Sequence, residues 1–198
     1  MEACLISSVV PPLNECFEEL CRNHLGIEPD FVEPEEQTQM QVLYHHRSDV
    51  GADRIVNAIA ARDLFGTPAI VVDFGTATTF DAVSKKGEYI GGIIAPGIGI
   101  SAEALFSRTA RLPRIDIRKP VHPIGQTTVE SMQSGIFYGY VGLVDGILKR
   151  MKKELGDAVV VATGGLAHLI STEYPGFDRI EDDLTLHGLR IFHENLRS

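Results

Sequence analysis

The sequence predicts an α/β protein in which strands and helices alternate and some of the connections are hairpins. Apolar runs that end in glycine turns are typical of buried strands, and they occur at 69–75, 89–97 and 158–165. Runs with helical spacing of apolar residues lie before, between and after them. The chain has 198 residues, of which 44% are hydrophobic, so it can bury a sizeable core. This order of elements favours mixed sheets covered by helices.

The first part of the chain is expected to hold one strand, two helices and a long loop. Pro11 and Pro12 favour a helix start, and Gly26 is a typical helix end. The polar loop is long enough to be functional, and His45 and His46 are most simply exposed residues within it. In order, the predicted elements are a strand at 5–10, a helix at 11–26, a loop at 33–49 and a helix at 52–65. The second helix is expected to point Ile55, Val56, Ile59 and Leu64 inward.

The rest of the chain is expected to begin with a hairpin whose tip is rich in glycine and threonine. The elements after it are a strand at 89–97, a helix at 98–108, a connection at 110–125, a long helix at 127–154, a strand at 158–163 and a final helix at 184–196. The long helix carries glycines at 135, 139, 142 and 146, which would let another backbone come close. That backbone could belong to a subunit partner or, equally, to the same chain.

Composition excludes several classes of function. The chain has 18 basic and 27 acidic residues and a net charge of -9, so no broad basic face is expected to bind nucleic acid. No apolar run approaches the length of a membrane span, and the first residues do not resemble a signal peptide. The three cysteines, Cys4, Cys16 and Cys21, are read as reduced, buried apolar thiols and not as a disulfide framework or a zinc site. A cytoplasmic protein without membrane or nucleic-acid partners is expected.

The strongest local signal is the run from Asp73 to Thr79, DFGTATT, at a strand end. Its glycine and threonines offer N–H groups and hydroxyls to phosphate oxygens, and the aspartate can hold a cation beside them. An ordinary tight turn with solvated threonines would have the same sequence. Similar glycine turns, at 91–97 and at Gly164-Gly165, could let a nucleotide approach the backbone or could be plain connections.

A second signal is Gly51-Ala52-Asp53-Arg54 at a predicted helix start. Asp53 could simply cap the helix, which is the commonest role of aspartate at such positions. It could instead act as the base that takes a proton from an attacking hydroxyl, with Arg54 as a positive charge beside the substrate or the transferring phosphate.

Taken in order, these motifs resemble those of type III pantothenate kinases. The matching runs are SSVVPP, VGADRIVNAIAA, IVVDFGTATT, YIGGIIAPG, TTVESMQSGIFYGYVGLVDG and ATGGLA, which together extend over nearly the whole chain. The resemblance implies an actin-like fold of two ribonuclease-H-type lobes with mixed sheets. Residues 1–66 would be the remainder of an incomplete first lobe, and 67–198 the second lobe with its C-terminal helix.

The resemblance also implies a function, which is ATP-dependent phosphorylation of pantothenate in coenzyme A biosynthesis. It makes Asp53 the general base and Arg54 its partner, with Tyr44, Gly51, Ala52 and Thr127 or Thr128 near pantothenate, the threonine reaching the partner subunit's site. The implied ATP ligands are Gly75, Thr76, Thr78, Gly97, Gly164 and Gly165, and Asp73 would bind K⁺ or NH₄⁺. Mg²⁺ and a homodimer are implied as well.

Two departures from the family pattern weaken this reading. The family's Asp-x-Gly-Asn-Thr run, which binds Mg²⁺ and phosphates, does not occur in these 198 residues, as if the opening segment were missing. We therefore expect little kinase activity from this chain alone. In the loop, Glu35 and Gln39 stand where glycines are expected, and His46 where proline is common.

Two other functions remain open at this point. A non-catalytic member of the family could act as a binding or accessory regulatory protein, which the missing motif favours. Retention of Asp53, Arg54 and Asp73 favours an enzyme. Another sugar- or acetate-type kinase is the third possibility, against which the GADR run argues.

Overall fold

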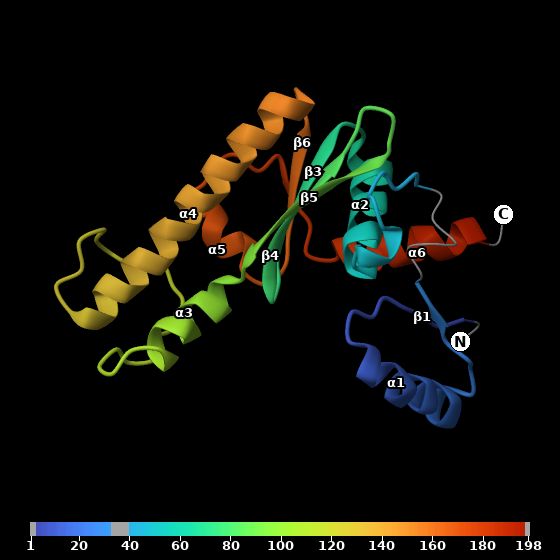
Figure 1. Ribbon diagram of the computed structural model, residues 1–198, viewed down its shortest axis with the longest axis horizontal. Helices are drawn as coiled ribbons and strands as arrows, with labels where there is room; N and C mark the ends of the chain where they lie inside the picture. The colour runs from blue at the N-terminus through green and yellow to red at the C-terminus, as the bar shows by residue number, and fades with distance from the viewer. Residues whose placement is uncertain (1–2, 33–39, 197–198) are drawn as a thin grey trace. The chain divides into compact units, whose positions relative to one another are not determined.

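The computed structural model describes residues 3–32 and 40–196 (Figure 1). The chain divides into two compact units. Unit 1 comprises Met1–Ala69, Val83–Gly91 and Asp183–Ser198, and unit 2 comprises Ile70–Ala82 and Gly92–Asp182. The sequence-based boundary between residues 66 and 67 stays a prediction about the family's lobes. The compact units follow a different division, because the last helix packs with the first unit.

Unit 1 is built around the packing of two helices, α2 (Ala52–Phe65) on α6 (Leu184–Leu196). A methyl group on Gly188 of α6 would overlap the carbonyl of Val56, so the two backbones approach closely. The hydroxyl of Thr185 donates a hydrogen bond of 2.7 Å to Asn57 Oδ1 across the same contact. The other elements of this unit are β1 (Leu5–Ile6), η1 (Pro11–Leu13), α1 (Asn14–Leu20), η2 (Cys21–Leu25), β2 (Asp30–Phe31) and η3 (Arg47–Asp49).

Helix α2 has the predicted bounds but not every predicted inward residue. Ile55, Val56 and Ile59 are at most 2% exposed, whereas Leu64 is 42% exposed. Leu64 lies nine positions after Ile55, which is two and a half helical turns, so the two side chains lie on opposite faces. The prediction that Leu64 points inward is therefore wrong.

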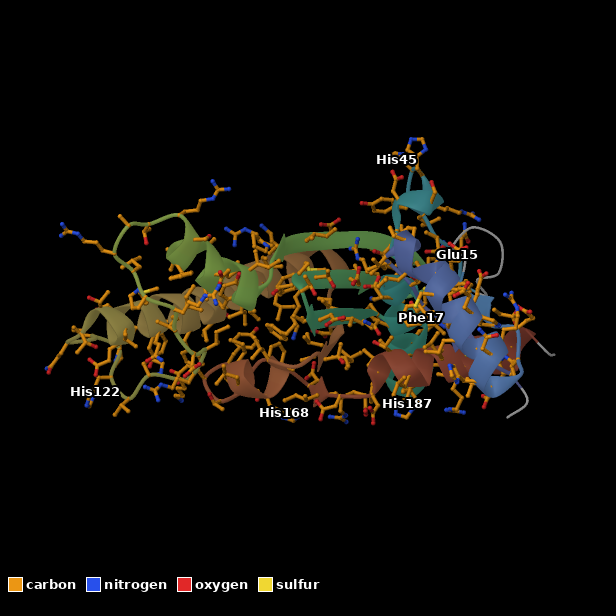
Figure 2. All side chains as sticks on the ribbon, turned by 90° about the horizontal axis from the view of Figure 1, so that it is seen from below. Glu15, Phe17, His45, His122, His168 and His187 are labelled. Carbon is orange, nitrogen blue, oxygen red and sulfur yellow. The ribbon has the colours of Figure 1, made fainter. Side chains whose placement is uncertain are left out.

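The N-terminal segment of unit 1 is less regular than the sequence predicts. The strand expected at 5–10 is limited to Leu5–Ile6, which pairs in parallel with β2, and Val9 and Val10 are 55% and 47% exposed. The two prolines that follow cannot donate to a ladder. The predicted helix runs through η1, α1 and the π-helical η2, and Gly26 ends it with a φ of 68°. Glu15, Phe17 and the exposed loop residue His45 are labelled in Figure 2.

A five-stranded sheet provides the frame for unit 2. Its strands lie in the order β5-β4-β3-β6-β7. Only two residues separate β3 from β4, so these neighbours run antiparallel, while β6 and β7 pair in parallel. Mixed strand directions confirm the predicted fold class. The strands are β3 (Ala69–Phe74), β4 (Ala77–Val83), β5 (Tyr89–Pro96), β6 (Val159–Thr163) and β7 (Arg179–Ile180).

Three helices complete unit 2, namely α3 (Ile98–Ser107), α4 (Thr128–Leu155) and α5 (Ala167–Ser171). Helix α4 contacts both of the others. Its start is fixed by a capping box, in which Thr127 Oγ1 accepts from the Glu130 N–H and the Glu130 carboxylate accepts from the Thr127 N–H. Among its predicted apolar residues, Ile136, Val144, Leu148 and Met151 are buried.

Two further predictions concern the loop at 33–49 and membrane-spanning helices. Glu35 and Gln39 lie outside the described residues. Within the described ranges, no helix is long and apolar enough to cross a membrane.

Candidate functional site

The predicted phosphate motif forms a two-residue turn between β3 and β4. Gly75 and Thr76 at its tip are exposed, and Asp73 just before it is half-buried. Thr78 lies on β4 with 0% exposure, and its hydroxyl has no hydrogen-bond partner among the described residues. The turn therefore presents the N–H groups and hydroxyl of Gly75 and Thr76 at the surface, while Thr78 faces the interior.

The glycine that precedes α3 lies directly against this turn. A methyl group on Gly97 would overlap the Thr76 carbonyl and would lie 2.9 Å from the Gly75 carbonyl oxygen. Gly97 is also the N-cap residue of α3, and its carbonyl accepts a hydrogen bond of 3.0 Å from the Ser101 N–H. The contact therefore places the start of α3 beside the Gly75–Thr76 turn. Helix starts favour anions, because their first N–H groups have no partner within the helix.

A second glycine turn, after β6, lies against the end of β3. A methyl group on Gly164 would lie 2.7 Å from both Asp73 Oδ1 and the carbonyl carbon of Phe74, and its φ of +89° is one that L side chains rarely adopt. Gly165, by contrast, has open space around it. The two adjacent glycines thus differ in the space around them. Only at position 164 does packing against Asp73 require a glycine.

An aromatic cluster supports the same end of β3. The rings of Phe74 and Phe177 meet edge to face at 5.9 Å, and those of Tyr174 and Phe177 at 4.9 Å. Burial raises the pKa of the Tyr174 hydroxyl, and the charges of Asp145 and Asp178 add to that effect. The hydroxyl therefore stays protonated at neutral pH. No local sequence pattern predicts this cluster, because nothing in the sequence brings residues 174–177 to β3.

In unit 1, the Asp53 carboxylate folds back over the start of α2. Its Oδ1 accepts a hydrogen bond of 2.8 Å from the Arg54 N–H. A methyl group on Gly51 would overlap that same oxygen, so a glycine at this position leaves room for the carboxylate. Ala52 is buried at 5% exposure. The N-cap residue of α2 is Gly51, which has no side chain to make a capping bond, so Asp53 accepts an N–H of the first turn without being the cap residue. This contact fixes the direction of the half-buried carboxylate.

Arg54 and Tyr44 are both held by a tyrosine that the sequence analysis did not single out. The Tyr89 ring has 0% exposure, and the Arg54 guanidinium lies 5.9 Å from its centroid. The Tyr44 ring, at 37% exposure, lies 6.5 Å from Tyr89. The Tyr89 N–H donates to the Gln41 carbonyl at 2.9 Å, and the Tyr89 carbonyl accepts from the Leu43 N–H at 2.8 Å, which holds the segment that leads to Tyr44. Tyr89 thus contacts two of the predicted pantothenate residues from a distant part of the sequence.

Thr127 and Thr128 differ in what their hydroxyls do. Both are exposed, but Thr127 Oγ1 is occupied by the capping box at 3.2 Å from the Glu130 nitrogen. Thr128, the first residue of α4, makes no side-chain hydrogen bond in the described part of the chain. Of the two alternatives that the sequence left open, Thr128 has the hydroxyl available to a ligand.

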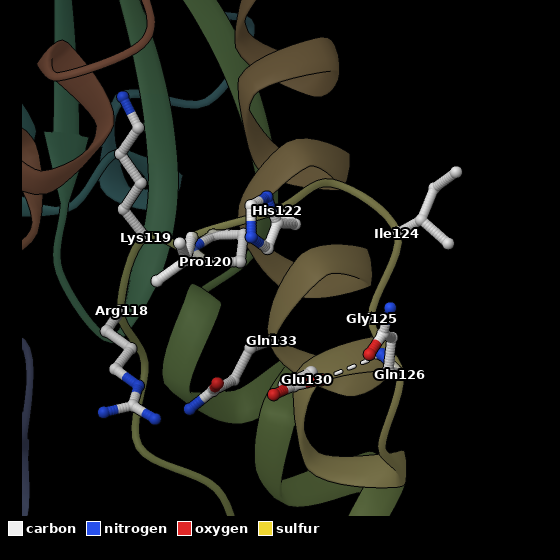
Figure 3. A pocket seen from close by; sticks show the side chains of 10 residues that line it. Arg118, Lys119, Pro120, His122, Ile124, Gly125, Gln126, Glu130 and Gln133 are labelled. Carbon is white, nitrogen blue, oxygen red and sulfur yellow. Dashed lines mark hydrogen bonds between the residues drawn. The ribbon is translucent and has the colours of Figure 1, made fainter.

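A pocket of about 320 Å³ lies beside the start of α4 (Figure 3). Its one deeply buried polar side chain is Gln133, which is 4% exposed and donates to the Asp116 carbonyl at 3.0 Å. Lys119, on its wall, is paired with Glu173 at 2.8 Å. The sequence analysis treated 110–125 as a plain connection, so this pocket was not predicted.

The predicted site residues thus form two groups, one in each unit. Tyr44 and the residues from Gly51 to Arg54 belong to unit 1, and the turn residues, Thr127 and Thr128 belong to unit 2. A common cleft that joins Asp53 to the Asp73 turn stays a prediction. Among the described residues, no group of three or more His, Cys, Asp or Glu side chains could hold a metal ion.

Comparison with known proteins gives consistent results. A family model described as type III pantothenate kinase matches residues 1–150. A protein of Koribacter versatilis named type III pantothenate kinase is 57% identical over 195 residues, which is 98% of this chain and 71% of the relative. One of the same name from Geobacter sulfurreducens is 54% identical over 198 residues, which is 100% of this chain and 78% of the relative.

One solved structure shares the fold. It comes from Campylobacter jejuni and is described as a conserved Baf family transcriptional activator. The TM-score is 0.67 at 20% sequence identity, and the match covers 100% of this chain and 85% of that one. At this identity the likeness concerns the fold alone.

Proposed function

Because this chain belongs to the type III pantothenate kinase family, we propose that it transfers the γ-phosphate of ATP to the primary hydroxyl of pantothenate. The product is 4'-phosphopantothenate, formed in the first step of coenzyme A biosynthesis. The observation that carries this proposal is the match to the Koribacter versatilis protein, at 57% identity over 98% of the chain. Kinases of this kind use ATP with a divalent metal ion, and in-line phosphoryl transfer depends mainly on positioning and charge.

The Asp53 carboxylate acts as the general base in this proposal. The fixed direction of the carboxylate supports this role. The Arg54 N–H donates to Oδ1, for which the glycine at position 51 leaves space, and Oδ2 is left to accept the hydroxyl proton. A base must reach that proton within hydrogen-bonding distance. Arg54 and Tyr44 bind pantothenate beside it, and Tyr89 keeps both side chains in place.

The Gly75–Thr76 turn, Gly97 and Gly164 bind the phosphates and the adenosine side of ATP. Support comes from the close approach of three backbone segments, which leaves no space for added methyl groups at Gly97 and Gly164. The half-buried Asp73 carboxylate has the oxygen donors that K⁺ or NH₄⁺ prefers. When bound, Mg²⁺ on the phosphates and a monovalent cation at Asp73 would neutralise negative charge.

The protein acts as a homodimer in this proposal. Methyl groups built on Gly135, Gly139 and Gly142 of α4 meet no atom within 4 Å, so these glycines do not serve packing within the described part of the chain. Of the two explanations that the sequence left open, an approaching partner backbone is favoured. Ile94, at 63% exposure, and Ile100, at 49%, add apolar surface in the same unit.

Substitution of the two threonines at the start of α4 should separate capping from binding. Thr128→Val is expected to raise the KM for pantothenate about two- to tenfold, the value of one hydrogen bond, with unchanged stability. Thr127→Val should instead lower stability by about 1 kcal/mol, because it removes the cap. Steady-state kinetics and thermal unfolding of both variants, made in a chimera with the Koribacter versatilis relative, test this assignment. Equal effects of the two substitutions on KM would contradict it.

The function is tested with a chimera in which this chain replaces the 195-residue matching segment of the Koribacter versatilis relative. We expect pantothenate-dependent ADP release from the chimera. The chain alone should turn over at least about 100-fold more slowly, because it contains no Asp-x-Gly-Asn-Thr run. An inactive chimera beside an active parent enzyme would refute the proposed function. Equal rates for chain and chimera would show that the run is unnecessary.

We also propose where the protein acts and how a non-catalytic role would differ from the kinase. We place the protein in the cytoplasm, without nucleic-acid or membrane partners, in line with its charge of -9. A non-catalytic accessory role would predict that the chimera binds ATP and pantothenate without turning them over. Mass spectrometry of the reaction products distinguishes the two functions.

A further inference from the structure

Two of the three cysteines lie side by side in unit 1. Cys4, just before β1, and Cys21, at the start of η2, have sulfur atoms 3.5 Å apart in a thiol hydrogen bond. Cys4 is half-buried and Cys21 is 3% exposed. The prediction of three buried apolar thiols is wrong for Cys16, which is exposed, and no local sequence pattern predicts the Cys4–Cys21 pair.

We propose that Cys4 and Cys21 are a modification site, where an oxidant of the low-molecular-weight disulfide class converts the two thiols to an intramolecular disulfide. The sulfur atoms would have to move closer by about 1.5 Å to reach a disulfide bond length. No other sulfur competes at the site, because Cys16 lies exposed on α1.

The reaction balances as two successive exchanges. The Cys4 sulfur, the more accessible of the two, attacks the small disulfide and releases one small thiol, which leaves Cys4 in a mixed disulfide. The Cys21 sulfur then attacks the Cys4 sulfur and releases the second small thiol. The protein loses two electrons and two protons, and the small disulfide is reduced to two thiols.

The surroundings of the Cys4 thiol slow its reaction with an oxidant. Burial raises the pKa of the Cys4 thiol, and the hydrogen bond to Cys21 and the charges of Cys21 and Asp30 act in the same direction. The thiol is therefore mostly protonated near neutral pH, and only the thiolate attacks. Reversible disulfides of this kind are the ones found in reducing compartments.

The disulfide would close a loop that reaches the candidate site. Val9 lies within the segment between the two cysteines, and its Cγ1 lies 3.4 Å from where a methyl group on Gly51 would be. The Cys4 carbonyl also accepts a hydrogen bond of 2.8 Å from the Asp30 N–H, which ties the same segment to β2. Oxidation would thus restrict a segment that contacts the start of the Gly51–Arg54 run.

The test is incubation of the 198-residue protein with glutathione disulfide, followed by alkylation and peptide mapping without reduction. The expected result is a linked Cys4–Cys21 peptide, with Cys16 alkylated and the link lost after dithiothreitol. The oxidised protein should also melt at least about 5 °C higher, because the closed loop restricts the unfolded chain.

Two cysteine variants show which sulfur atoms form the link. Cys16→Ser should form the link as the unchanged protein does, whereas Cys4→Ser should not, and Cys4→Ser avoids altering the buried Cys21. Free Cys4 and Cys21 after full exposure to the oxidant, a stable glutathione adduct on Cys4, or a link that needs Cys16 would each overturn the proposal. None of these readouts depends on kinase activity, so the inference can fail independently of the proposed function.

Discussion

Asp53→Asn in the chimera is expected to lower kcat by about 10²–10⁴-fold, or about 3–5 kcal/mol of barrier lowering, because asparagine cannot accept the hydroxyl proton. The KM for ATP should change little. The fold should be preserved, since asparagine accepts a hydrogen bond at a helix start as well as aspartate does, and the contact with the Arg54 N–H can persist. Steady-state kinetics with pantothenate and ATP measures the effect.

Asp49→Asn is the matched control for this substitution. Asp49 is an exposed acidic residue in η3, just before the Gly51–Arg54 run, and it makes no side-chain hydrogen bond in the described structure. The same change of charge there should leave kcat within about a factor of two of the unsubstituted chimera, as expected of an exposed side chain without contacts. A kcat for Asp53→Asn that matches this control would remove Asp53 from the role of base.

Gly164→Ala is expected to give the second large effect, a loss of stability of about 2–5 kcal/mol. The new methyl group would lie 2.7 Å from Asp73 Oδ1 and from the Phe74 carbonyl carbon, at a φ of +89°. Backbone strain and crowding each cost about 1–3 kcal/mol. Thermal unfolding should show a fall in Tm of about 5–15 °C, and ATP affinity should drop because the end of β3 must move.

Gly165→Ala provides the control within the same turn. Gly165 has no atom within 4 Å of the added methyl position and no positive φ. The free energy of unfolding of the Gly165→Ala variant should therefore change by no more than about 0.5 kcal/mol. Equal destabilisation by the two substitutions would contradict the packing of Gly164 against Asp73. A stable Gly164→Ala variant with normal ATP affinity would contradict its place in the nucleotide site.

The long elements of the fold could be predicted because their signals are local. Helices α2, α4 and α6 have the spacing of apolar residues that defines a helix, and α2 and α4 are also flanked by glycine or a capping residue. The hairpin could be predicted because glycine and threonine follow a buried strand directly. The strand at 5–10 was overestimated, because pairing depends on a partner, and β2 provides only two residues.

Contacts between distant residues could not be predicted in the same way. No local pattern tells that Tyr89 contacts Arg54 and Tyr44, or that the Cys4 and Cys21 sulfur atoms meet. Likewise, Gly164 and Gly165 are indistinguishable in the sequence, as are Thr127 and Thr128. Their different roles follow from what each residue meets in the folded chain.

The central claim is that Asp53 accepts the proton of pantothenate while the Gly75–Thr76 turn holds the phosphates of ATP. A crystal structure of the chimera with pantothenate and a non-hydrolysable ATP analogue tests it most directly. We expect the primary hydroxyl of pantothenate within hydrogen-bonding distance of the Asp53 carboxylate, about 2.6–3.2 Å, and phosphate oxygens at the N–H groups of the turn. A pantothenate hydroxyl bound away from Asp53, or a nucleotide bound away from the turn, would contradict the mechanism.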